Sequence, residues 1–127
     1  MAATAPQPTT KPEIKILYSE SDDTVLSSQT AQIRKAGYQV ATALNRAQVQ
    51  DALQKGAFDL VILGSTLSKD DRHHLPYMVK KAHPGTRVLV MHAGTHHHEV
   101  DATVDSGMSM LRVLEKIATL LQPAAAN

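Results

Sequence analysis

The chain has 127 residues, a formal net charge of +1 and no cysteine. This length suits one domain with a substantial core, and the near-neutral charge argues against strong electrostatic binding to nucleic acid or an acidic membrane surface. The lack of cysteine excludes disulfides and thiolate metal sites, and an aromatic share of 3% argues against a platform for base stacking. No apolar run is long enough to span a bilayer and no secretory signal is visible, so we expect a cytoplasmic protein.

The two ends of the chain lack hydrophobic periodicity. Residues 1–12 are rich in Ala, Thr, Pro and Gln, and residues 123–127 are similar in character. Such composition predicts disordered tails on either side of a single domain at 13–122.

The first part of the domain alternates strand and helix patterns. The predicted elements are a strand at 14–18, a helix at 24–35 capped by Ser21 or Asp22 and ended by Gly37, a strand at 38–43, and a helix between Asn45 and Gly56. The apolar positions predicted to face inward are Val25, Leu26, Ala31 and Ile33 in the first helix and Val49, Ala52 and Leu53 in the second.

The apolar run Leu60–Leu63 is followed directly by Gly64-Ser65-Thr66. A run that is apolar on both faces is typical of a central strand in a parallel sheet. In open α/β sheets the working site lies beyond the carboxyl ends of such strands, and Gly64 offers no side chain there.

The second part of the domain continues the alternation with one interruption. The predicted elements are a polar loop at 68–74, a helix with Pro76 in its first turn that ends at Pro84-Gly85, a strand at 87–92, a weak strand at 101–105 and a helix at 108–121. The stretch 94–100 is too short for an ordinary crossover helix. The apolar stripe predicted for the last helix is Leu111, Leu114, Ile117, Ala118 and Leu121.

Four segments resemble the receiver domain of bacterial two-component response regulators. They are Ile16-Leu17-Tyr18-Ser19-Glu20-Ser21, Ala36-Gly37-Tyr38-Gln39-Val40, Phe58-Asp59-Leu60-Val61-Ile62-Leu63 and His83-Pro84-Gly85-Thr86-Arg87-Val88-Leu89-Val90. Their spacing matches without a gap from Lys15 to Ala93. The resemblance implies a flavodoxin-like α/β fold, with a doubly wound five-stranded parallel sheet in the order 2-1-3-4-5 and the helix between strands 4 and 5 shortened or missing.

The resemblance also implies where a phosphorylation site would lie. In the family, an acidic pair and an acceptor aspartate bind Mg²⁺, the aspartate takes a phosphoryl group from a histidine kinase, and a Ser/Thr and a Lys respond to the new charge. The corresponding positions here are Glu20 and Ser21, Gly64, His92 and Ser106-Gly107, of which only Glu20 keeps a family-like character.

These replacements predict a pseudo-receiver, because Gly64 has no nucleophile and Ser106 cannot neutralise a phosphoryl group. Glu20 with Asp22 or Asp23 would hold Mg²⁺ at most weakly. We therefore expect no enzymatic activity, no cofactor, and a phosphorylation-independent protein-interaction role in bacterial two-component-type signalling. The same acidic residues would repel a phosphate, which argues against an FMN or nucleotide site.

Two alternatives remain open. Ser65 or Thr66 could accept the phosphoryl group as in a conventional phosphorelay receiver, although loop hydroxyls usually satisfy backbone groups. The chain also has seven histidines, and His92, His96 and His98 are candidate ligands for Zn²⁺, Ni²⁺ or Cu²⁺ in a metal- or pH-sensing module. The histidines lack the spacing of a defined metal motif, and neighbouring residues of an extended segment point in opposite directions.

A missing crossover helix would leave apolar surface uncovered near the last helix. The residues of this predicted partner surface are Met108, Met110, Leu111 and Val100. We expect its partner to be an unidentified signalling protein or a second copy of the chain, rather than nucleic acid or membrane.

Overall fold

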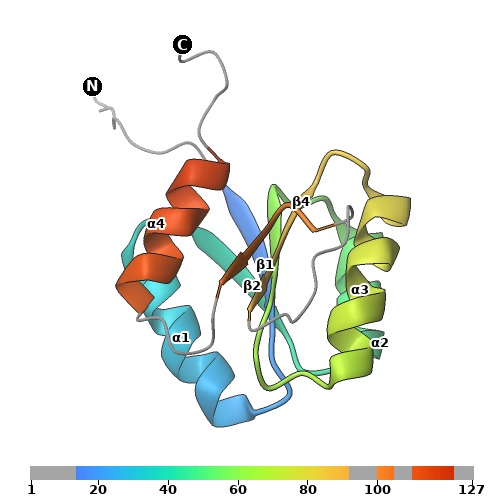
Figure 1. Ribbon diagram of the computed structural model, residues 1–127, viewed down its shortest axis with the longest axis horizontal. Helices are drawn as coiled ribbons and strands as arrows, with labels where there is room; N and C mark the ends of the chain where they lie inside the picture. The colour runs from blue at the N-terminus through green and yellow to red at the C-terminus, as the bar shows by residue number, and fades with distance from the viewer. Residues whose placement is uncertain (1–13, 92–99, 105–109, 122–127) are drawn as a thin grey trace, which may run out of the picture.

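The computed structural model describes residues 14–91, 100–104 and 110–121 (Figure 1). Its centre is a five-stranded parallel sheet of β1 (Lys15–Ser19), β2 (Gln39–Ala43), β3 (Leu60–Leu63), β4 (Arg87–Met91) and β5 (Ala102–Val104). The strand order is β2-β1-β3-β4-β5, which confirms the predicted flavodoxin-like topology. Every residue of β3 is buried, as expected for a central strand covered on both faces.

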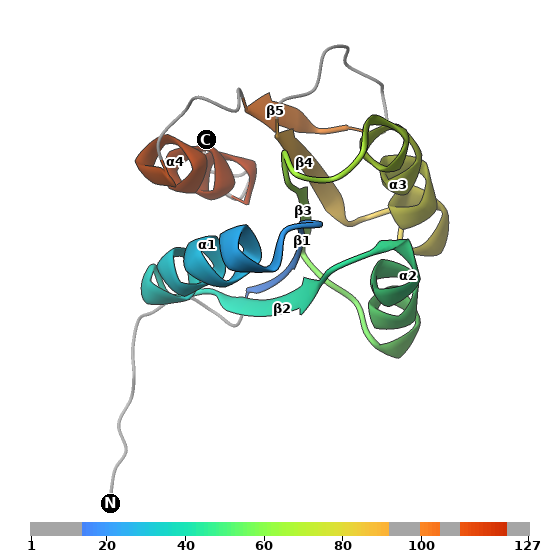
Figure 2. The same cartoon turned by 90° about the horizontal axis from the view of Figure 1, so that it is seen from below.

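Four helices cover the two faces of the sheet (Figure 2). They are α1 (Asp23–Lys35), α2 (Arg46–Lys55), α3 (Lys69–Ala82) and α4 (Met110–Leu120). Helices α1 and α4 lie on one face, and α2 and α3 lie on the other. Among the described residues, no helix is long and apolar enough to cross a membrane.

Alternate strand residues divide the core between the two faces, because successive strand side chains point in opposite directions. Ile16 and Tyr18 of β1 pack with the α1 and α4 side chains, whereas Leu17 of β1 packs with those of α2 and α3. The described residues therefore form two apolar clusters, one on each face of the sheet.

Local signals fix the first two helices as predicted. The Asp22 carboxylate accepts a hydrogen bond from the Val25 N–H at 3.1 Å and caps α1, and Asn45 caps α2 through the Gln48 N–H at 2.9 Å. Gly37 has a φ of 108° just after α1, a conformation that favours glycine. Thr30, and not the predicted Ala31, is the buried residue in that part of α1.

The prediction of a polar loop at 68–74 is wrong, because α3 begins at Lys69. The Ser68 hydroxyl accepts a hydrogen bond from the Asp71 N–H at 3.1 Å, and the acidic side chains of the first turn complement the helix dipole. Pro76 consequently lies inside the helix rather than in its first turn, and it is buried against the sheet side together with Leu75.

The predicted stripe of α4 is correct for Leu114, Ile117 and Leu121, which pack with the core, and wrong for Leu111 and Ala118. Val113 and Ile117 are the buried residues, whereas the Leu111 side chain is 66% exposed and Ala118 is also exposed. The half-buried side chains that join this core are Met110, Leu114, Leu120 and Leu121. The stretch predicted to lack a crossover helix lies, apart from Val100, outside the described residues.

Candidate functional site

The carboxyl ends of β1 and β3 bring together the two residues of greatest interest. Glu20 directly follows β1, and Gly64 directly follows β3. The Gly64 N–H donates a 2.8 Å hydrogen bond to the Ser19 carbonyl, and the Glu20 N–H donates one of 3.2 Å to the Ala43 carbonyl. These bonds hold both backbones at the sheet edge where α/β proteins place their sites.

The Glu20 side chain points inward and has no exposed surface. Its Oε1 accepts hydrogen bonds from the Thr66 N–H at 2.9 Å and from the Thr66 hydroxyl at 2.6 Å. Its Oε2 accepts a hydrogen bond from the Tyr18 hydroxyl. Three donors therefore stabilise the buried carboxylate, as burial of such a group requires.

The Tyr18 hydroxyl keeps its proton and donates it in the hydrogen bond to this carboxylate. Burial, the hydrogen bond to Glu20 and the nearby negative charge of Glu20 all raise the pKa of the Tyr18 hydroxyl well above its usual value. The hydroxyl also lies 2.6 Å from Oε1 of Gln29 in α1. Tyr18 thus joins the carboxylate to the helix that covers this face of the sheet.

The Glu20 carboxylate occupies the space into which a side chain at position 64 would project. A Cβ atom on Gly64 would lie 1.9 Å from the Glu20 carboxyl carbon, and 2.0 and 2.1 Å from its oxygens Oε2 and Oε1. Among the described glycines, the positive φ belongs to Gly37 and not to Gly64. A side chain at position 64 would therefore require the Glu20 carboxylate or the backbone to move, whereas the backbone conformation itself does not demand glycine.

Thr66 has a structural role in this loop. In addition to its donation to Glu20, its hydroxyl accepts hydrogen bonds from the N–H groups of Ser21 at 2.9 Å and Asp22 at 3.1 Å. These contacts agree with the interpretation that the loop hydroxyl satisfies backbone groups. The neighbouring Ser65 is half-buried. Phosphorylation of either hydroxyl stays a prediction.

The acidic residues near Glu20 do not converge on a cation site. Asp22 uses its carboxylate to cap α1, and Asp23 lies exposed in the first turn of the same helix. Within 14–91, 100–104 and 110–121, no three His, Cys, Asp or Glu side chains are arranged to hold a metal ion. Weak binding of Mg²⁺ stays a prediction.

Arg72, which was not predicted as a site residue, reaches the same edge of the sheet from α3. Its Nη1 lies 3.5 Å from the carbonyl oxygen of Met91, the last residue of β4. A cationic group therefore stands near the carboxyl ends of the strands. The Ser68-Lys69-Asp70-Asp71 run, with a cap residue followed by two acidic residues, was the signal that could have placed Arg72 on a helix.

Several predicted residues lie outside the described part of the chain. These are His92, His96, His98, Ser106 and Met108. Of the predicted partner surface, Leu111 is exposed, Met110 is half-buried, and Val100 is buried with 3% exposure. Val100 packs with the α2 and α3 side chains, so its assignment to a surface was wrong.

No protein-family model matches the chain. The chain is 29% identical over 92 residues to the alginate biosynthesis transcriptional regulatory protein AlgB of Pseudomonas putida (strain KT2440). The match covers 72% of this chain and 20% of that protein, and AlgB of Pseudomonas syringae pv. tomato (strain DC3000) matches to the same extent. The chain therefore spans about a fifth of the length of these relatives.

Solved structures of response regulators share the fold. A two-component response regulator from Clostridium difficile superposes with a TM-score of 0.77 at 15% identity, covering 90% of this chain and 100% of that one. The non-phosphorylated HemR receiver domain from Leptospira biflexa gives a TM-score of 0.75 at 17% identity, covering 91% and 99%. The response regulator TrrA from Thermotoga maritima, in complex with Mg²⁺-BeF, gives 0.70 at 18% identity, covering 85% and 99%. This chain thus has the fold of receiver domains.

Proposed function

We propose that the chain is a pseudo-receiver, a module of two-component-type signalling that works through protein contact without phosphorylation of its own. The observation that carries this proposal is the Glu20 carboxylate, whose carbon would lie 1.9 Å from a Cβ atom on Gly64. Gly64 is the position that the resemblance assigns to the acceptor aspartate. A nucleophilic side chain has no room there while Glu20 stays buried.

The Glu20 carboxylate is also poorly suited to replace the acceptor. Its Oε1 already accepts two hydrogen bonds from Thr66, and its Oε2 accepts one from Tyr18. A carboxylate offers about four acceptor sites, so these bonds leave little for Mg²⁺ or for attack on a phosphoryl donor. Complete burial further separates this carboxylate from solvent.

The similarity to response regulators supports the signalling context. AlgB is a transcriptional regulatory protein, and the structural relatives are response regulators and receiver domains. Because the chain spans only a fifth of AlgB, we transfer neither a transcriptional role nor a DNA site to it.

We further propose that the outward face of α4 contacts the partner. The Leu111 side chain is 66% exposed although it is large and apolar, whereas Val113 and Ile117 of the same helix are buried. An exposed apolar side chain next to the half-buried Met110 is suited to a protein contact. The expected partner is a signalling protein or a second copy of the chain.

Treatment with acetyl phosphate and Mg²⁺, followed by intact-mass measurement, tests the central claim. We expect an unchanged mass, while a conventional receiver treated in parallel gains one phosphoryl group. A gain of one phosphoryl group by this chain would overturn the proposal. If the chain does gain a phosphoryl group, the same treatment of the Ser65→Ala and Thr66→Val variants follows. Loss of the added mass in one of them would identify that hydroxyl as the acceptor of a conventional receiver.

A photo-crosslinking residue at position 111 tests the proposed surface in the native host. We expect one dominant adduct, either with a second copy or with one other protein, that is lost when the crosslinker is moved to the exposed position Lys35 of α1. Equal adduct patterns at both positions would remove the support for the α4 face.

A further inference from the structure

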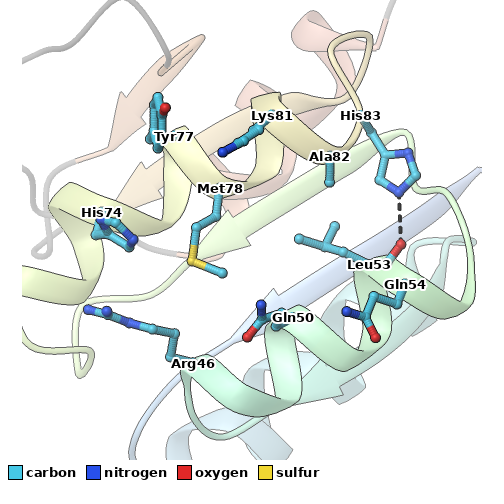
Figure 3. A pocket seen from close by; sticks show the side chains of 10 residues that line it. All are labelled: Arg46, Gln50, Leu53, Gln54, His74, Tyr77, Met78, Lys81, Ala82 and His83. Atoms are coloured by element: carbon cyan, nitrogen blue, oxygen red, sulfur yellow. Dashed lines mark hydrogen bonds between the residues drawn. The ribbon is translucent and has the colours of Figure 1, made fainter.

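A second surface lies on the opposite side of the sheet from α4. Helices α2 and α3 run side by side there, and an open groove of about 680 Å³ lies along them (Figure 3). Leu53 and Met78 provide apolar groups between the two helices, and Ala82 adds a third near the end of α3. Tyr77 also lines the groove, and its side chain is 52% exposed. In the described part of the chain, Leu111 and Tyr77 are the two large apolar side chains with such exposure.

The charged residues that line this groove are cationic. Arg46 lies at the start of α2, and Lys81 lies near the end of α3, while no aspartate or glutamate is among the lining residues. Arg46 is paired at 2.7 Å with Asp71 but keeps 45% of its side chain exposed. Lys81 has no ion pair within the described residues. The groove therefore favours a partner that brings negative charge.

Polar side chains complete the α2 wall of the groove. Gln50 and Gln54 are one helical turn apart and line it together. Neither side-chain amide makes a hydrogen bond to another described residue. His83 Nε2, in contrast, already donates to the Leu53 carbonyl at 2.8 Å and ties the ends of the two helices together. The side-chain amides of Gln50 and Gln54 are thus available to pair with a peptide backbone. The His83 hydrogen bond fixes the spacing of the two helices at this end.

The separation of the lining residues along α3 indicates an elongated ligand. Arg46 and His74 both line the groove, and Lys81 is seven residues after His74 along α3. At about 1.5 Å per residue, this separation is roughly 10 Å. One phosphate cannot span that distance. Carboxylates four residues apart on an extended peptide lie on one face, about 13 Å apart, with the side chain of the middle residue between them on the same face.

We propose that the α2–α3 groove binds a short acidic segment of a partner protein, with an apolar side chain between two carboxylates. The apolar side chain packs between Leu53 and Met78, one carboxylate pairs with Lys81, and the other lies at the Arg46 and His74 end. The two glutamines pair with the backbone of the segment. This proposal does not depend on the pseudo-receiver function, because no residue of the Glu20 site lines the groove.

Selection of a displayed library of random 12-residue peptides on the full chain tests the proposal. We expect the enriched peptides to carry acidic residues on both sides of an apolar one. Their affinity for the Lys81→Glu variant should fall by about tenfold or more, because a paired charge becomes a repelling one. The matched control is Lys55→Glu, which makes the same charge change on an exposed side chain of α2 outside the groove, and should change the affinity by less than about twofold.

A charge-swap experiment distinguishes a loss of peptide recognition from altered folding of the Lys81→Glu variant. Peptides whose acidic residue nearest Lys81 is replaced by lysine should bind the Lys81→Glu variant better than the parent chain. Enrichment without an acidic bias, no enrichment over the bare support, or equal loss in the Lys55→Glu control would each overturn the proposal. Binding of inorganic phosphate with the same dependence on Lys81, in the absence of peptide binding, would also overturn it.

Discussion

Replacing Gly64 with alanine probes the contact on which the proposed function depends. The added Cβ would lie 1.9 Å from the Glu20 carboxyl carbon, so either the backbone or Glu20 must move. Overpacking of a core costs about 1–3 kcal/mol, and each hydrogen bond lost from a charged group costs about 1.5–3 kcal/mol. The gain from a less flexible unfolded chain is only about 0.4–1 kcal/mol. We expect Gly64→Ala to lower the free energy of unfolding by about 3 kcal/mol.

A double-mutant cycle attributes this cost to Glu20. In a Glu20→Ala background the added methyl group meets no carboxylate, and Gly64→Ala should then cost less than about 1 kcal/mol. In a Glu20→Gln background the obstructing group keeps its size, so the large cost should persist. The chain contains no tryptophan, and urea unfolding followed by far-UV circular dichroism is the suitable measurement.

Gly85 supplies the matched control, because a Cβ there would meet nothing within 4 Å. Gly85→Ala should change the free energy of unfolding by less than about 1 kcal/mol. If Gly64→Ala is as mild as Gly85→Ala, or costs the same with and without Glu20, the reasoning about this site is refuted.

Two further perturbations test other parts of the structure. Because the pKa of Tyr18 is raised in the folded chain, its hydroxyl stays protonated while the unfolded one ionises near pH 10, so stability should fall as pH rises from about 9 to 11. Urea midpoints measured across that range should fall less steeply in Tyr18→Phe; equal slopes would contradict the raised pKa. Asp101→Ala removes the acceptor for the Val88 N–H at 2.7 Å and for Lys80 Nζ at 2.8 Å, and should destabilise the fold by about 2 kcal/mol in the same urea assay. Asp51→Ala breaks only an exposed pair and should change stability by less than about 0.5 kcal/mol; a similar loss in both variants would contradict this ranking.

The sheet could be predicted from the sequence because its signals are local and agree with one another. The Leu60–Leu63 run is apolar on both faces, and Asp22 and Asn45 are strong helix caps. The prediction for α3 rested on the preference of proline for the first helical turn, and it failed because the Ser68 cap starts the helix earlier. In α4, the predicted stripe included Leu111 and omitted Val113, and packing on the sheet buries Val113 while Leu111 stays exposed.

Only part of the candidate site could be predicted from the sequence. The sequence identifies Gly64 as a position without a side chain, because glycine follows a buried strand directly. It does not reveal that Glu20 turns inward, since that depends on donors from Tyr18 and Thr66 that converge only after the strands pair. Arg72 was not predicted at the site because it lies in the first part of α3, which was predicted as a loop.

The packing of Glu20 against Gly64 has an evolutionary consequence. Replacement of Gly64 alone by aspartate would push a new carboxylate into volume that Glu20 already fills. An acceptor at this position would also need Glu20 to become smaller or to turn outward, and that change by itself supplies no chemistry. Selection would therefore have to cross an intermediate with lower stability and no benefit, so the proposed loss of phosphorylation is hard to reverse.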